Sequence, residues 1–250
     1  MKVVFITAIG VGGATVFGAA IGYLFKKIPH KYNDMIMGFA AGIMLAAAVL
    51  GLIIPSLEFG GKHGVWMTSI GILAGALFLN FADRFIPHMH SMVGIDREKH
   101  ADVTALNRIM LFVLAIAIHN FPEGLAAGVA FGAGNLSNAI TVAVGIALQN
   151  IPEGMIIVSP LMIAGLSRRK AFAVAALTGV VEVVGTMLGY FAITLSSAIL
   201  PFALAFAGGT MLYVISDEMI PQTHSHGHEQ LATYSLLAGF IVMLILDFYI

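Results

Sequence analysis

Long apolar runs alternate with short polar connections along the whole chain. An α-helix needs about 20 apolar residues to cross the hydrocarbon core of a bilayer. The pattern therefore predicts an all-α membrane protein with eight transmembrane helices in one transmembrane domain over residues 1–250. The helices are expected at about 3–25, 33–57, 64–86, 105–132, 138–165, 171–197, 199–221 and 231–249.

The composition supports this setting. Hydrophobic residues make up 59% of the chain and charged residues only 10%, with a mean hydropathy of +0.97. Soluble domains average roughly 25% charged residues, so a soluble chain could not hide this much apolar surface. The lipid bilayer is the expected partner. The net charge of −1 gives no basic field that would indicate nucleic-acid binding.

Basic residues divide unevenly when alternate connections are assigned to opposite sides of the membrane. Only Lys2 and Lys62 fall on one side. The positive-inside rule then makes the other side cytoplasmic and predicts a multi-pass plasma-membrane protein, in a bacterial inner membrane, with both termini extracytoplasmic. The cytoplasmic set is Lys26, Lys27, Lys31, Arg84, Arg97, Lys99, Arg108, Arg168, Arg169 and Lys170.

Two near-copies of one motif lie in the middle of the fourth and fifth apolar runs. They are His119-Asn120-Phe121-Pro122-Glu123-Gly124 and Gln149-Asn150-Ile151-Pro152-Glu153-Gly154. A charged side chain at the centre of a membrane helix costs roughly 2.5–3.5 kcal/mol on insertion scales, so it normally faces an interior pathway. The motifs therefore predict a cation site between helices.

Helical spacing arranges these side chains in two sets. Residues four apart share a face, so His119 pairs with Glu123, and Gln149 pairs with Glu153. The neighbouring Asn120 and Asn150 lie about 100° round the helix and can serve a second position, bridged to the first by the glutamates. Glu182, an isolated acid in the sixth run, needs a cation or a proton and is a further candidate ligand.

The ligand types limit the metal. The chain has no cysteine, which excludes thiolate sites. Imidazole, carboxylate and amide oxygen suit Zn, Fe, Mn, Co or Ni. Protons are expected to compete with the metal, because the empty site would hold repelling carboxylates.

The prolines and glycines of the motifs predict local structure. Pro122 and Pro152 each remove a backbone donor, so each helix is expected to open beside its ligands. Small residues let the fourth and fifth helices approach closely, and an inverted repeat is the expected architecture around a midplane site. The small residues are Gly124, Gly128, Gly132, Gly145 and Gly154.

With these motifs, Glu182, and the segments 207–213 and 217–221, the chain resembles the ZIP divalent-metal transporters, in particular their bacterial broad-specificity and GufA-like branch. The resemblance implies inverted three-helix repeats around a central helix pair, metal uptake into the cytoplasm, an elevator-like motion, and no enzymatic activity. Zinc, and also iron, manganese, cobalt or cadmium, would be the transported substrate, with no resident cofactor. The implied binuclear centre is His119, Asn120, Glu123, Gln149, Asn150, Glu153 and Glu182.

Two other classes of function remain open at this point. A divalent-cation channel fits the same residues, and a membrane-embedded dinuclear metalloenzyme fits them less well because no His-Glu-x-x-His motif is found. Gly-rich faces such as 71–75 allow a homodimer as well as a monomer. Some family members carry Asp where this chain has Asn150, and the neutral amide is expected to weaken one of the two metal positions.

Histidines also gather in two predicted cytoplasmic connections. They are His88, His90 and His100 in one, and His224, His226 and His228 in the other. They are expected either to form a release or sensing station for arriving metal or to sit in an ordinary solvated loop. Asp83, Asp217 and Glu218 lie toward the same ends of their helices and can line an exit.

Overall fold

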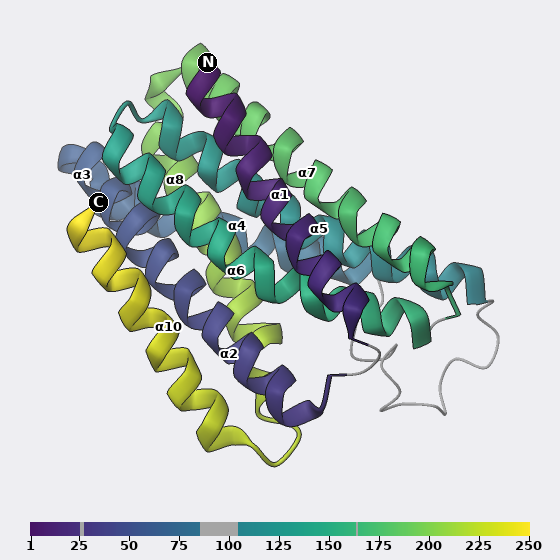
Figure 1. The fold of residues 1–250 in the computed structure, drawn as a ribbon. Coiled ribbons are helices and arrows are strands. Elements are labelled where there is room, and N and C mark those ends of the chain that lie inside the picture. Colours follow the sequence, from purple (N-terminus) through teal and green to yellow (C-terminus); the bar gives the residue numbers. More distant parts are fainter. Residues whose placement is uncertain (26–27, 86–104, 164) are drawn as a thin grey trace.

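The computed structural model describes residues 1–25, 28–85, 105–163 and 165–250, and every element within them is a helix (Figure 1). The side chains of 83–85, 105–116 and 163 lie outside the description. In chain order the elements are α1 (Lys2–Leu24), α2 (His30–Ala46), the π-helix η1 (Ala47–Ile53), α3 (Ile54–Phe59), the 3-10 helix η2 (Gly61–His63), α4 (Gly64–Phe85), α5 (Ala105–Gly132), α6 (Leu136–Ile163), α7 (Arg168–Leu195), the 3-10 helix η4 (Ser197–Ile199), α8 (Leu200–Val214), the π-helix η5 (Ile215–Met219), α9 (Ile220–Thr223) and α10 (Glu229–Tyr249).

The all-α prediction is confirmed for this part of the chain. Helices begin up to three residues earlier than expected where polar residues such as Arg168 and Glu229 form the first turn. Hydropathy marks only the apolar section of a helix, whereas the helix itself continues into the interface. Within the described residues, seven helical stretches are long and apolar enough to cross a membrane. The remaining predicted span, 105–132, coincides with α5, and its crossing stays a prediction.

The long helices pack in two groups. In the first, α1 packs against both α6 and α7, and α5 packs against α7 (Figure 1). In the second, α2 packs against α10, and α4 packs against α8. The groups meet where α2 contacts α6 and where α5 contacts α8. Both motif-bearing helices belong to the first group, so the candidate site lies within it.

Glycines set the helix contacts of the first group, but not the ones expected. A Cβ on Gly124 would meet the backbone of Glu182 in α7, and one on Gly154 would meet the backbone of Thr15 in α1. Gly128 and Gly132 also face α7, and Gly145 faces α10. The prediction that these glycines join α5 to α6 is therefore wrong. Adjacent motifs on adjacent helices suggested that pairing, but each glycine face receives a helix from elsewhere in the chain.

The prolines of the two motifs do not break their helices. Pro122 lies inside α5 and Pro152 inside α6, and both helices continue through them. Wide π-helical turns occur instead in η1 and η5, each followed by a short helix with a proline in its first turn, Pro55 or Pro221. The expected opening beside the ligands is replaced by two irregular segments in the other group of helices.

The two termini lie at the same end of the bundle (Figure 1). The Ser137 hydroxyl, at the start of α6, donates a hydrogen bond to the carbonyl of Ile250. At the opposite end, the guanidinium carbon of Arg168 lies 4.4 Å from the ring centroid of Tyr23. Lys31, Arg169 and Lys170 belong to that opposite end. Lys26, Lys27, Arg97 and Lys99, and the side chains of Arg84 and Arg108, fall outside the description.

Candidate functional site

Glu182 on α7 is fully buried and joins three other helices. Its Oε1 accepts hydrogen bonds from Thr15 Oγ1 on α1 and from Asn120 Nδ2 on α5, both at 2.5 Å. Its Oε2 accepts a hydrogen bond from Asn150 Nδ2 on α6. The same amide nitrogen lies 3.2 Å from the carbonyl oxygen of Val11. Glu182, which has no other acidic residue near it in the sequence, thus connects α1, α5, α6 and α7.

Glu123 and Gln149 form a second buried link, between α5 and α6. The amide Nε2 of Gln149 donates to Glu123 Oε1 at 2.9 Å. Glu123 is 1% exposed and Gln149 is 0% exposed. Burial of an ionisable group with a single neutral donor is costly unless another charge compensates it. The site therefore favours a cation or a proton at this point.

Three buried oxygen atoms around these links have no hydrogen-bond partner among the described residues. They are Glu123 Oε2, Gln149 Oε1 and Asn150 Oδ1. An unsatisfied buried acceptor costs roughly 1–3 kcal/mol, so three of them in one place require an explanation. A divalent cation supplies one, because it binds carboxylate and amide oxygens directly.

His119 and Glu153 complete the predicted set. The Nε2 atom of His119 lies 3.0 Å from Oε1 of Glu218, a buried residue of η5, which links the two groups of helices. Glu153 is half-buried, and its charge interacts with those of Glu123, Glu182 and His119. The fold thus brings all seven predicted side chains into one region.

The arrangement is not a ready-made metal cage. Among the described residues, no three or more His, Asp or Glu side chains are grouped as metal ligands. The amides of Asn120 and Asn150 point their N–H groups at Glu182, whereas the Asn150 amide oxygen has no hydrogen-bond partner among the described residues. An amide carries an acceptor and a donor on the same carbon, so a flip exchanges one for the other.

Comparison with known proteins decides the family. The model of a family described as ZIP zinc transporters matches residues 95–247. The zinc transporter GufA of Myxococcus xanthus is 41% identical over 242 residues, which cover 94% of each protein. The chain belongs to the ZIP family. Zinc transporter ZIPB of Bordetella bronchiseptica is 36% identical over 94% of this chain and 77% of that protein. Zinc transporter ZIP11 of Homo sapiens is 32% identical over 94% of this chain and 93% of that protein.

Membership of the ZIP family makes this chain a transporter rather than an enzyme. The metalloenzyme alternative is therefore excluded. The resemblance drawn from the two motifs is confirmed. Family membership does not by itself assign a ligand role to any one of these residues.

The sequence did not predict two features of this ZIP site. One is the hydrogen bond from Thr15 to Glu182, and the other is the contact between Glu218 and His119. Thr15 lies in the row of small residues on the buried face of α1, between Gly12 and Gly18. A polar residue in a stripe of glycine and alanine was the available signal. Asp217, the neighbour of Glu218, is exposed, so the two acids of the predicted exit point to different surroundings.

Histidines in the connection between α9 and α10 make hydrogen bonds and a ring contact with neighbouring helices. His224 Nδ1 lies 2.9 Å from the carbonyl oxygen of Ile220, and its Nε2 lies 3.1 Å from Thr233 Oγ1. His226 Nδ1 lies 3.0 Å from the buried Asp34 Oδ1, and its ring stacks on that of His30 with centroids 4.3 Å apart. The idea of an unengaged, solvated loop is wrong for these two histidines. His88, His90 and His100 lie outside the described residues.

Proposed function

We propose that this protein carries zinc, and also iron, manganese, cobalt or cadmium, across the plasma membrane into the cytoplasm. The transport site would lie near the middle of the membrane. The three unpartnered buried oxygens around Glu123 are the main support for the proposal, because a divalent cation bound between them would satisfy all three. Relatives named zinc transporters support zinc as the main substrate. The proposed ligands are His119, Asn120, Glu123, Gln149, Asn150, Glu153 and Glu182.

The proposed site has two positions. The first uses His119, Glu123, Gln149 and Glu153, and the second uses the two asparagines with Glu182. An entering metal would replace the amide donors on the carboxylates, and flipped amides would present their oxygens. The substrate thus takes over the role that Thr15 and the amides now fill. Because Asn150 is neutral, the second position has less negative charge and is expected to bind metal more weakly.

The proposed topology is eight spans with inverted three-helix repeats and both termini outside. Three observations support it. The α1–α6 contact has its counterpart in α5–α7, and the α2–α10 contact has its counterpart in α4–α8. A π-helix followed by a proline occurs once in each half. The basic end of the bundle lies opposite the termini.

An elevator-like carrier is the proposed mode of transport. Glycines bring the backbones of α1, α5, α6 and α7 close together, so this group can move as one unit. In the second group, glycines bring α2 close to α10 at Gly38, Gly42 and Gly239, and α4 close to α8 at Gly75 and Gly209. Rigid-body movement of one group of helices against another is how many transporters expose a midplane site alternately.

Uptake of radioactive zinc into proteoliposomes tests the proposal and separates it from the channel alternative. A carrier gives saturable uptake that iron, manganese, cobalt and cadmium reduce in proportion to their affinity. A channel gives flux that rises with zinc concentration without saturating. Competition between protons and metal further predicts slower uptake at about pH 5 than at about pH 8. A flat profile between these values would contradict that competition.

A further inference from the structure

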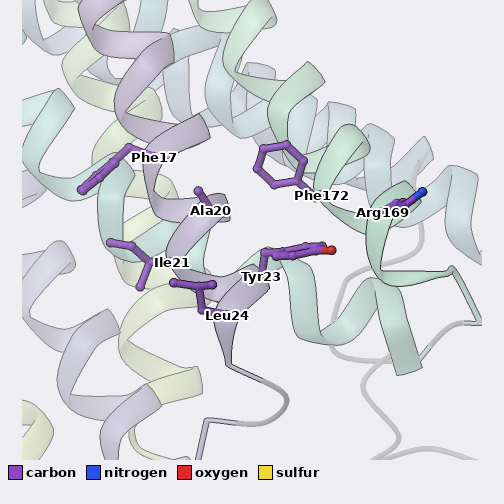
Figure 2. A pocket seen from close by; sticks show the side chains of 7 residues that line it. All are labelled: Phe17, Ala20, Ile21, Tyr23, Leu24, Arg169 and Phe172. Atoms are coloured by element: carbon purple, nitrogen blue, oxygen red, sulfur yellow. The ribbon is translucent and has the colours of Figure 1, made fainter.

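An apolar cavity of about 460 Å³ lies between the ends of α1 and α7, apart from the metal site. Its volume falls within the roughly 300–1,000 Å³ typical of small-ligand pockets. Figure 2 shows Tyr23 reaching from α1 toward α7, with Phe172 beside it and Arg169 at the edge. The cavity is lined by Phe17, Ala20, Ile21, Tyr23, Leu24, Arg169 and Phe172.

The cavity opens on the outer face of α1. Phe17, Ala20 and Leu24 are exposed, whereas Thr15 and Ala19 on the same helix are buried toward the site. In a transmembrane bundle, an exposed apolar face of this kind meets lipid. The cavity is therefore accessible to lipid molecules of the bilayer rather than to a ligand from the metal pathway.

The rim of the cavity is positively charged. Arg168, Arg169 and Lys170 begin α7, and none of them forms an ion pair with a described residue. The guanidinium of Arg168 stacks over Tyr23, yet its buried Nε atom has no hydrogen-bond partner among the described residues. Ser167, at the N-cap, makes no side-chain capping bond, so the backbone N–H groups of the first turn also stay available.

We propose that this cavity binds one anionic phospholipid. An acyl chain would lie along Phe17, Ile21 and Phe172, and the phosphate would meet Arg169 and the start of α7. The charge matches, because a helix N-terminus and guanidinium groups both favour a phosphate. Basic pockets between transmembrane helices are a recurrent place for anionic head groups. The basic end is also the end that charge distribution assigns to the cytoplasmic leaflet, where anionic lipids are common.

Native mass spectrometry of the purified, detergent-solubilised protein tests this directly. The probes are phosphatidylglycerol and phosphatidylcholine with the same acyl chains. We expect a one-to-one adduct with phosphatidylglycerol and binding at least fivefold weaker with phosphatidylcholine. Inorganic phosphate at millimolar concentration should not displace the lipid. Equal binding of both lipids, or full displacement by phosphate, would overturn the proposal.

Two variants locate the bound lipid. Arg169→Gln should weaken phosphatidylglycerol binding about fivefold, as expected for one basic group near a membrane, whereas Lys62→Gln at the other end should not change it. Ala20→Phe should fill the cavity and reduce binding further, whereas Val3→Phe on the same helix should have no effect. Monodisperse elution and unchanged helical circular dichroism establish that each variant is folded. Wild-type lipid binding in folded Arg169→Gln and Ala20→Phe would overturn the proposal.

Discussion

At the scale of single residues, the site is a set of acids held by neutral donors. Glu182 takes three such donors from three helices, and Glu123 takes one. Each donor satisfies a carboxylate while leaving the net charge of the cavity unchanged, so the attraction for a divalent ion persists. A neutral donor can also leave when a metal arrives. These two properties suit a site that must bind its substrate and release it.

Thr15 should contribute to stability through Glu182. Thr15→Val keeps the shape of the side chain but removes the donor, so we expect a loss of about 1.5–3 kcal/mol, as for other hydrogen bonds to charged groups. Denaturant titration of the metal-free protein in mixed micelles measures it. Thr194→Val is the control, because Thr194 is exposed and bonds only to a backbone carbonyl in its own helix. Equal stability of the two variants would contradict the role given to Thr15.

Sequence alone predicted the candidate acids but not their partners. The two motifs mark Glu123 and Glu153 because a membrane helix rarely carries a charge without a reason. Thr15 lies 167 residues from Glu182, and Val11 lies 139 residues from Asn150, so no local spacing relates these partners. Such contacts depend on which helices pack together, and hydropathy carries no information about helix partners.

At the scale of elements, close backbone approach holds the site together. Gly124 sits against Glu182 itself, and Gly185 on α7 sits against Phe121 on α5. This mutual contact brings the α5 motif within reach of the buried acid. The glycine interface expected between α5 and α6 is absent because these glycines pack against α7, α1 and α10 instead. Sequence predicted close helix packing correctly but could not assign the partner.

Gly124→Ala tests this packing. The added Cβ would meet backbone atoms of Glu182, which cannot move as a flexible side chain would, so α5 and α7 must separate. We expect a loss of about 1–3 kcal/mol of stability, typical of overpacking, and at least a tenfold fall in zinc uptake. Gly13→Ala is the matched control, because a Cβ there meets nothing within 4 Å. The same denaturant and uptake assays apply. Similar behaviour of the two variants would show that this contact does not position the site.

At the scale of the whole molecule, the distribution of basic residues bears on the orientation of the bundle in the membrane. The ends of the bundle differ in basic content, and both termini share the less basic end.

Hydropathy predicted the ends of the membrane-crossing helical stretches to within three residues, because crossing a bilayer requires a minimum length of apolar helix. The π-helices η1 and η5 were not predicted, since a wide turn leaves no periodic signature in an apolar run.

Cysteine labelling tests the orientation. The chain has no cysteine, so a single introduced one is the only thiol. Lys62→Cys should react with a membrane-impermeant thiol reagent in intact cells, because residue 62 lies at the same end of the helix bundle as the two termini. Ser225→Cys should react only after the membrane is made permeable. The reverse pattern would contradict the N-out and C-out topology.

Zinc uptake into proteoliposomes by Glu123→Gln, compared with Glu58→Gln, tests the central claim most directly. Both changes remove one carboxylate and keep the size of the side chain, but Glu123 is buried in the site and Glu58 is exposed at one end of the bundle. We predict that Glu123→Gln lowers saturable uptake about tenfold or more, as loss of a metal-site group typically does. Glu58→Gln should transport like the wild type. Undiminished uptake by correctly folded Glu123→Gln would show that the metal does not pass through this site.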